Sequence, residues 1–279
     1  MIVSADTAGA ELHSLKLDGR EYLWQSSDAW KRYAPVLFPF ICSPGSKKYK
    51  AGGKEYIMPA NHGFARDSEF TASGSDGMTM SFTLSSDENT RLVYPYDFSL
   101  KVSYELDPEH DDTLHIVNEV TNTGDTPMYF YIGGHPAINC PLEDGLSFDD
   151  YHVEYEKPET IIQVWNGTRT IIENDNRLKL TRALFDNDVI MKDAPASRCI
   201  TLKSDKGSRG VTLSWNDSCK CISVWSPTGN DDAAFVCLEP WTSVPVYADD
   251  EFEDIEKKPH AIKLDPGKSF TFDYRIRVF

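Results

Sequence analysis

Hydrophobic and polar residues alternate along many short segments of this chain. In the C-terminal segment SFTFDYRIRVF, aromatic and aliphatic residues occupy every second position and polar residues the positions between them. This two-residue period is typical of a strand with one buried face. Similar runs, bounded by turn residues, recur from end to end: EYLWQ, EYIM, TMSFTLSS, DFSLKVSYELD, TLHIVNEVTNTG, PMYFYIGG, GVTLSWND, CISVWS and AAFVCLEPW.

Long segments with the period of an amphipathic helix are missing, which favours an antiparallel all-β fold. With so many strands, a large two-sheet β-sandwich is favoured over a barrel. The 279 residues are 40% hydrophobic, enough to bury a substantial core. No Gly/Ser linker or change in composition divides the chain. We therefore predict a single domain over residues 1–279.

The charge of the chain excludes some classes of partner. The net charge is −16 and the pI is about 4.8, so phosphate backbones and anionic lipid surfaces would be repelled. We expect neither nucleic acid nor a membrane as partner. The N-terminal segment has neither a basic start nor an unbroken apolar run, and the six cysteines show no CxxC spacing. Both features favour a cytoplasmic protein with reduced thiols.

The segment NHGFARDSEF is the first candidate for chemistry. His62 and Arg66 flank a glycine-containing turn, so both polar heads could project from a loop at a sheet edge. The competing interpretation is an ordinary polar loop with a surface arginine, and for this motif alone we favour it.

The segment YIGGHPAINCPL is the second. In a continuous strand, Tyr129, Tyr131, Gly133 and His135 would share one face, and the glycines would leave space for a ligand beside the imidazole. Pro136 would hold His135 in an extended conformation. A histidine that only packs against a sheet end is an equally good interpretation.

The segment DDAAFVCLEPW is the third. Glu239 shares a strand face with Phe235 and Cys237, and a carboxylate in so apolar a run must be paired, hydrated or raised in pKa. Taken alone, a glutamate emerging into solvent at a strand end is the simpler interpretation. Together, the histidine and glutamate segments could converge on one concave face and form a proton donor and acceptor, with Trp225 and Trp241 available to stack on a sugar ring.

Six segments resemble, in the same order, the aldose 1-epimerase (galactose mutarotase-like) family, particularly its LacX-type branch. They are GAELHSLKLDGREYLWQ, WKRYAPVLFPF, GKEYIMPANHGFARDSEF, GGHPAINCPL, LFDNDVIMKD and CLEPWTSVPVYADD. The combination of the HGFAR, GGHP and EPW blocks carries the resemblance. It implies a β-supersandwich and a cofactor-free interconversion of the α and β anomers of an aldose.

The resemblance also implies roles for particular residues. Glu239 matches the base that takes the proton from the C1 hydroxyl, and His135 matches the acid that protonates the ring oxygen. His62 matches a second histidine that hydrogen-bonds the sugar. Asp188 is assigned to binding sugar hydroxyls, although Asp186 is an alternative.

One position departs from the family pattern. Ser43 stands near where related sequences carry a sugar-binding arginine, and Arg66 could take over that role. The resemblance implies a small sugar as partner, a hexose or a hexose phosphate. A phosphate would need a basic cluster at the pocket rim, for which Lys31, Arg32, Lys47 and Lys48 are the candidates.

Two other functions compete with this hypothesis. A carbohydrate-binding protein of the same fold could bind sugar without turnover, although a binder needs no acid–base pair. A metal-dependent enzyme could use His62, His135 and Glu239 as a facial triad. Such sites normally gather their histidines at short spacing, which is not the case here.

Overall fold

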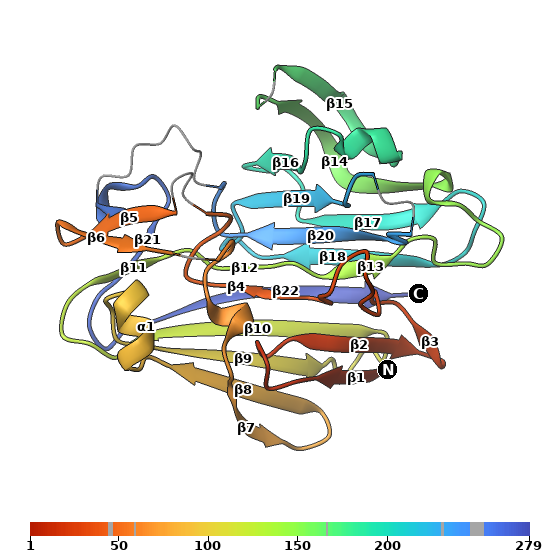
Figure 1. Cartoon of the computed structure of the whole chain (residues 1–279). Helices are drawn as coiled ribbons and strands as arrows, with labels where there is room; N and C mark the ends of the chain where they lie inside the picture. Colours follow the sequence, from red (N-terminus) through yellow and green to blue (C-terminus); the bar gives the residue numbers. More distant parts are fainter. Residues whose placement is uncertain (44–46, 59, 166, 230–231, 246–253) are drawn as a thin grey trace.

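A nine-stranded antiparallel sheet forms one layer of the fold (Figure 1). The computed structural model describes residues 1–43, 47–58, 60–165, 167–229, 232–245 and 254–279. The order of strands across this sheet is β15 (Arg169–Lys179), β14 (Tyr151–Gln163), β17 (Cys199–Ser204), β18 (Gly210–Trp215), β22 (Ser269–Val278), β10 (Thr113–Asn122), β9 (Phe98–Leu106), β8 (Thr79–Ser85) and β7 (Thr71–Ser75).

A second sheet carries the candidate chemistry. Its order is β16 (Ile190–Asp193), β19 (Cys221–Trp225), β20 (Phe235–Trp241), β12 (Gly133–Gly134) and β4 (Val36–Leu37), with β13 (Ala137–Asn139) also paired to β20. All pairings are antiparallel. Strand β20 is buried along its whole length.

Smaller elements complete the described part of the chain. They are the sheet β1 (Ile2–Ala5), β2 (Leu12–Leu17) and β3 (Arg20–Glu21), the pairs β5 (Lys48–Ala51) with β6 (Lys54–Ile57) and β11 (Met128–Phe130) with β21 (Ile262–Leu264), the helix α1 (Glu88–Val93), and the 3₁₀ turns η1 (Ala65–Asp67), η2 (Phe148–Asp150), η3 (Arg182–Phe185) and η4 (Ile255–Lys257). The prediction of an all-β fold is confirmed. No helix in the described ranges is both long and apolar enough to span a membrane.

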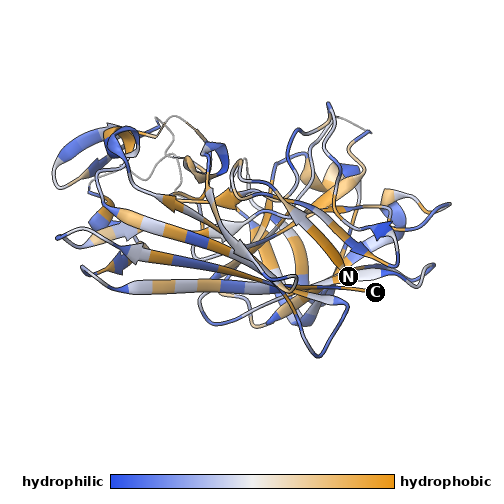
Figure 2. Ribbon diagram, turned by 90° about the horizontal axis from the view of Figure 1, so that it is seen from below, coloured by the Kyte–Doolittle hydropathy of each residue, from blue (hydrophilic) through white to orange (hydrophobic). Residues whose placement is uncertain are grey.

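The core lies where the two large sheets meet. On β22, the predicted alternation is confirmed, because Phe272, Tyr274 and Ile276 are buried while Arg275 and Arg277 are exposed. Figure 2 shows this separation along the strands, with hydrophobic stretches in the interior and hydrophilic ones at the turns. Buried residues of both sheets belong to one hydrophobic cluster, as expected for a sandwich.

The structure corrects one strand prediction at the histidine segment. Residues 127–134 do not form one strand but two: β11 pairs with β21, and β12 pairs with β4 and β20. The chain leaves one sheet and enters another between Phe130 and Gly133. Tyr129, Tyr131 and His135 therefore do not share the face of a continuous strand. The alternation of hydrophobic and polar residues indicates which residues are buried before and after the chain changes sheet, but it does not indicate that the sheet has changed.

The long hairpin of β14 and β15 has no counterpart among the predicted strands. Its sequence YHVEYEKPETIIQ carries charges and Pro158 in the middle, which weakens the pattern of a strand. The pairing is irregular there, with register shifts between Glu154 and Glu159. The hairpin projects from the nine-stranded sheet above the other strands (Figure 1).

Candidate active site

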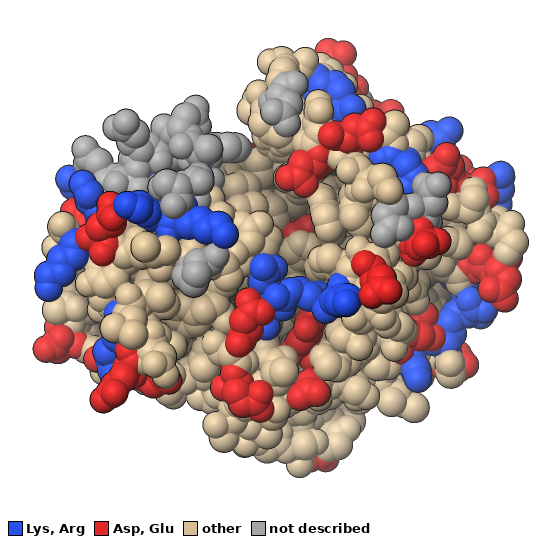
Figure 3. Space-filling view, viewed as in Figure 1, with Lys and Arg blue, Asp and Glu red and all other residues tan. Residues whose placement is uncertain are grey.

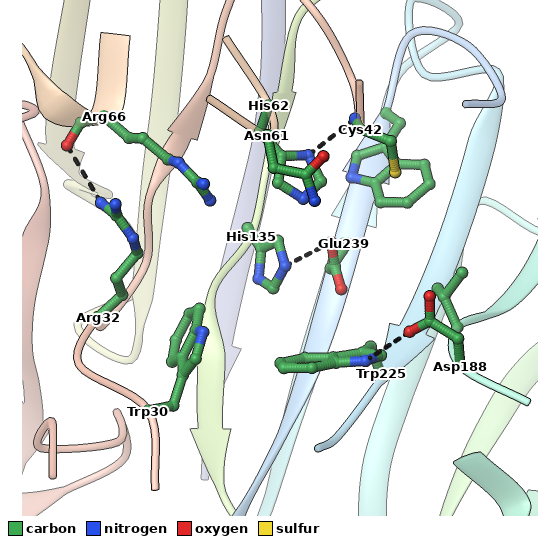
Figure 4. A pocket seen from close by; sticks show the side chains of 12 residues that line it. Trp30, Arg32, Cys42, Asn61, His62, Arg66, His135, Asp188, Trp225 and Glu239 are labelled. Carbon is green, nitrogen blue, oxygen red and sulfur yellow. Dashed lines mark hydrogen bonds and ion pairs between the residues drawn. The ribbon is translucent and has the colours of Figure 1, made fainter. Parts of the chain in front are cut away.

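The register of β20 places His135 opposite Glu239. On one side of the Pro136 break, Gly133 pairs with Trp241, and on the other side Ala137 pairs with Cys237. The same register on both sides brings residue 135 level with residue 239. The imidazole Nε2 of His135 lies 3.1 Å from Oε2 of Glu239 (Figure 4).

The two glycines before His135 have a different role from the predicted one. A Cβ at Gly133 would lie 2.6 Å from Cδ1 of Trp241, and one at Gly134 would lie 2.4 Å from Oη of Tyr274. The space beside the glycines is thus filled by protein side chains and not left for a ligand. The glycines allow β12, which pairs with β20 and β4, to lie against the side chains of Trp241 and Tyr274. This packing fixes the position of the backbone just before His135.

Glu239 does not emerge into solvent at a strand end. It lies within β20, is 1% exposed and is followed by Pro240 in the same strand. Burial raises the pKa of Glu239 well above its usual value, and the negative charge of Asp188 adds to this effect. The interpretation of Glu239 as a buried carboxylate with a shifted pKa is therefore the one that the structure supports.

The imidazole of His135 experiences the opposite shift. Burial lowers the pKa of His135 to about 3. Nδ1 of His135 has no hydrogen-bond partner among the described residues, whereas Oε2 of Glu239 faces Nε2 of His135 at 3.1 Å. A buried polar atom without a partner, in a residue that lines the pocket, is suited to a hydrogen bond with a polar ligand.

His62 is held in one tautomer by the backbone. The amide N–H of Cys42 donates to its Nδ1 at 2.9 Å, so a neutral imidazole must carry its proton on Nε2. Burial, and next the proximity of His135, hold the pKa of His62 well below its usual value. The ring is therefore a fixed, neutral donor, 5.5 Å from the ring of His135 between centroids.

The turn after His62 requires a glycine. The backbone of His62 is left-handed, with φ of 62°, and that of Gly63 has φ of 75°. A Cβ at Gly63 would lie 2.1 Å from the carbonyl oxygen of Phe38. This close approach allows the amide of Phe38 to donate to the carbonyl of His62 at 3.2 Å, which fastens the HGFAR turn to β4.

Arg66 and Arg32 lie together at one side of the pocket. Nη2 of Arg32 donates to Oδ1 of Asp67 at 2.6 Å, and its Nη1 donates to the carbonyl of Arg66 at 3.3 Å. The guanidinium of Arg66 points toward His62 and His135 (Figure 4). The interpretation of Arg66 as a surface arginine of an ordinary loop does not hold, because its side chain is only 14% exposed.

Of the two candidate aspartates, only Asp188 lines the pocket. Its Oδ1 accepts a hydrogen bond of 3.0 Å from the indole N–H of Trp225, and its backbone is left-handed, with φ of 69°. Asp186 ends the turn η3, is exposed and does not contribute to the pocket lining.

These side chains surround a cavity of about 280 Å³. Figure 3 shows the hollow in the face of the molecule, with basic side chains along one rim. Its wall includes Trp225 and Trp241, as predicted, but neither Tyr129 nor Tyr131. The lining residues are Trp30, Arg32, Cys42, Asn61, His62, Arg66, His135, Asp188, Val189, Trp225, Glu239 and Trp241.

Four lining residues were not assigned to the sugar site from the sequence: Trp30, Cys42, Asn61 and Val189. The ring of Trp30 stacks on that of His135 at 5.3 Å between centroids. One signal in the sequence could have indicated two of them, because Trp30 and Asn61 lie in segments that resemble the aldose 1-epimerase family. Cys42 lines the pocket where Ser43 was expected to matter, and Ser43 itself does not.

The predicted basic cluster is only partly assembled. Arg32 lines the pocket, whereas Lys31 is 78% exposed and pairs with Asp28, and Lys48 pairs with Glu55. Lys47 does not line it either.

One group in the described part of the chain could hold a metal ion, and it differs from the triad considered above. It consists of His135, Cys237 and Glu239, whose ligand atoms lie within 4.8 Å of one another. Burial raises the pKa of the Cys237 thiol well above its usual value, which disfavours the thiolate that a metal would require. Nδ1 of His62 is already engaged by the Cys42 amide. The donor set therefore suits proton transfer better than metal binding.

Comparison with known proteins gives consistent matches. Residues 1–277 match the family described as Aldose 1-epimerase. The plasmid-encoded protein LacX of Lactococcus lactis subsp. lactis is 31% identical over 298 residues, covering 100% of this chain and 96% of the relative. A putative glucose-6-phosphate 1-epimerase of Escherichia coli K12 is 28% identical over 265 residues, and the match covers 90% of this chain and 81% of that relative.

Among solved structures, a galactose mutarotase related enzyme from Lactobacillus acidophilus superposes with a TM-score of 0.91. It is 29% identical, and the match covers 99% of this chain and 94% of that chain. The predicted fold is thereby confirmed.

Proposed function

This chain belongs to the aldose 1-epimerase family, and from this premise we propose that it interconverts the α and β anomers of an aldose without a cofactor. Family and fold support a mutarotase-like, sugar-binding function. The observation that carries the proposal of catalysis is the pair formed by His135 and Glu239. Its atoms Nε2 and Oε2 lie 3.1 Å apart, and both residues line the cavity. A protein that only binds sugar has no need of such a pair.

The chemistry requires one proton to be removed and another to be delivered. Burial acts against the charge of Glu239 and against the charge of His135, so the pair retains one proton in total over a wide pH range. A pair with one proton always contains one donor and one acceptor. This is the condition for acid–base catalysis in both directions of a reversible reaction.

In the proposed ring opening, the one proton of the pair passes from Glu239 to His135 across the 3.1 Å between them when the sugar binds. Glu239 is then the carboxylate that accepts the proton of the C1 hydroxyl, and His135 is the imidazolium that donates a proton to the ring oxygen. The bond between C1 and the ring oxygen breaks, and an aldehyde forms at C1. Rotation about the C1–C2 bond exposes the other face of the aldehyde. Ring closure then reverses both proton transfers and leaves the hydroxyl in the opposite configuration.

The remaining residues position the sugar. The Nε2–H of His62 is available as a donor because Nδ1 accepts from Cys42. Arg66 and Asp188 supply a donor and an acceptor for hydroxyl groups at different sides of the cavity (Figure 4). Trp225 fixes the carboxylate of Asp188 through the 3.0 Å hydrogen bond.

We expect the pH profile of kcat/KM to show no fall at the ordinary histidine pKa of about 6.5. An ordinary histidine acid would lose activity above about pH 6.5. Here the pKa of His135 is lowered to about 3 and that of Glu239 is raised, so the singly protonated pair persists on both sides of that value. Anomer exchange measured by NMR below and above this value provides the test. A tenfold change per pH unit centred between pH 6 and 7 would contradict the expectation.

Replacing Asp188 by Asn is expected to raise KM by about tenfold and to leave kcat within a few fold, since a charged hydrogen-bond acceptor is lost. Asparagine tolerates the left-handed backbone at this position and can still accept from Trp225. The matched control is Asp186→Asn, which removes the same charge outside the pocket. Equal effects of the two substitutions would reject the assignment of Asp188 over Asp186.

The direct test of the function is the equilibration of freshly dissolved α-glucose and α-galactose, followed by polarimetry or NMR with and without the protein. Accelerated equilibration is the expected result. Saturable sugar binding without acceleration would instead favour the non-catalytic carbohydrate-binding protein.

The proposal extends to organisation and location. We propose a single domain over residues 1–279, because one cluster of buried hydrophobic residues extends from Ala10 to Val278. We also propose a cytoplasmic location, which is supported by six cysteines that are all free thiols.

A further inference from the structure

Two guanidinium groups stand beside the pocket and share one close carboxylate. Arg32 contacts Asp67 at 2.6 Å, and Nε of Arg66 lies 3.8 Å from the other oxygen of the same carboxylate. Nε of Arg66 is buried and has no hydrogen-bond partner among the residues that the structure describes. Both arginines line the cavity, in a protein whose net charge is −16. A local excess of positive charge in so acidic a chain is unusual and points to an anionic ligand.

The nearest further carboxyl group does not neutralise this excess directly. Glu11 accepts two backbone hydrogen bonds, from the amides of Tyr33 and Ala34 at 2.7 and 2.9 Å. Both bonds go to Oε1, which ties this oxygen to the loop that carries Arg32, and Glu11 makes no ion pair with Arg66 or Arg32 within 4.0 Å in the described structure. Burial also raises the pKa of Glu11, which disfavours its charged form.

The proposed reaction, on which this inference rests, determines which part of the sugar faces the two arginines. If the C1 hydroxyl lies at Glu239 and the ring oxygen at His135, the exocyclic C6 of a hexopyranose lies on the ring-oxygen side, because C6 is bonded to C5. In Figure 4, Arg66 and Arg32 lie on the side of His135 opposite to Glu239 and Asp188. The C6 substituent is therefore directed toward the two guanidinium groups.

We propose that Arg32 and Arg66 form a binding site for an anionic group on C6 of the hexose, either a phosphate ester or a carboxylate. Guanidinium groups bind both anions through paired, charge-assisted hydrogen bonds. Arg66 provides the inner contact near the ring, and Arg32 provides the outer contact at the rim, where its side chain is 26% exposed.

The test compares anomer exchange by NMR for three substrates in each of two series: glucose or galactose, the corresponding 6-phosphate, and the corresponding 6-carboxylate. We expect kcat/KM for one of the two anionic forms to exceed that for the neutral sugar by at least tenfold. Preference for the 6-phosphate would identify a phosphate site, and preference for the 6-carboxylate a hexuronate site.

Variants of Arg32 show whether the charge is responsible. Arg32→Gln is expected to lower the ratio of anionic to neutral kcat/KM by about tenfold, the effect of one charge-assisted contact. Arg32→Lys should lose less of the ratio than Arg32→Gln, because the charge remains although the paired hydrogen bonds are lost. The control is Lys31→Gln, which removes a charge from the adjacent residue that points to solvent and pairs with Asp28; it should leave the ratio unchanged.

The outcomes separate this inference from the proposed function. Acceleration of neutral sugars without preference for either anion would overturn the anion site and leave the epimerase proposal intact. Equal losses of the ratio in Arg32→Gln and Arg32→Lys would also overturn it, since the effect would then be structural. Acceleration of none of the six sugars would refute the proposed function and, with it, this inference.

Discussion

Replacing Glu239 by Gln lowers kcat for anomer exchange by about 10³-fold while sugar binding changes little. This size is expected for the loss of one acid–base group, which typically contributes about 10² to 10⁴ in rate. Glutamine keeps the shape of the side chain and can still hydrogen-bond the C1 hydroxyl, but it cannot accept the proton. The measurement is NMR exchange for the rate and calorimetric titration for the affinity.

The stability of Glu239→Gln provides a check on folding. The raised pKa of Glu239 means that its contribution to stability is fully present below pH 4.5 and is lost as the pH rises toward the folded-state pKa. A neutral glutamine removes this loss. We therefore expect the melting temperature of the variant to match or exceed that of the wild-type protein at pH 8.

A matched control for the same substitution is Glu119→Gln, at an exposed position of β10. It should leave rate and affinity unchanged. If Glu239→Gln binds sugar tightly and turns over at the wild-type rate, Glu239 is not the base and the assignment fails.

Replacing His135 by Gln is expected to lower kcat by about 10² to 10³-fold, again the range for one acid–base group. The matched control is His152→Gln, because His152 is also buried, at 4% exposure, but lies on β14 outside the pocket. That variant should keep full activity. A loss of activity with His152→Gln equal to that with His135→Gln would indicate general damage to the fold and not the loss of the acid.

The double variant of His135 and Glu239 distinguishes a coupled pair from two independent groups. If the two residues act as a unit, the double variant should be about as slow as the slower single variant, because removing either member already abolishes concerted proton transfer. Multiplication of the two single losses would contradict this. The NMR exchange rate measures both cases on the same substrate.

The alternation of side chains predicted about half of the strands in the described chain. It correctly indicated the long strands of the nine-stranded sheet from β8 to β10 and β22, because each of them buries one face along its length. It failed in the hairpin around Pro158 and at the crossing between Phe130 and Gly133, where the burial pattern is interrupted. It also missed strands such as β1, β2 and β17, and in the predicted strand EYLWQ only Glu21 belongs to a strand. Local pattern reports burial, whereas the sheet to which a strand belongs depends on distant partners.

The sequence by itself identified an all-β chain and selected His62, Arg66, His135, Asp188 and Glu239 as the residues of interest. Only the tertiary structure decided how they act together. The register of β20 against β12 and β13 sets His135 opposite Glu239, and the packing of both glycines under Trp241 and Tyr274 holds that register. Likewise, the loop with Trp30 and Arg32 reaches the pocket through contacts with residues more than 30 positions away. Such long-range pairings arise from the closing of the core and leave no signal in any one segment.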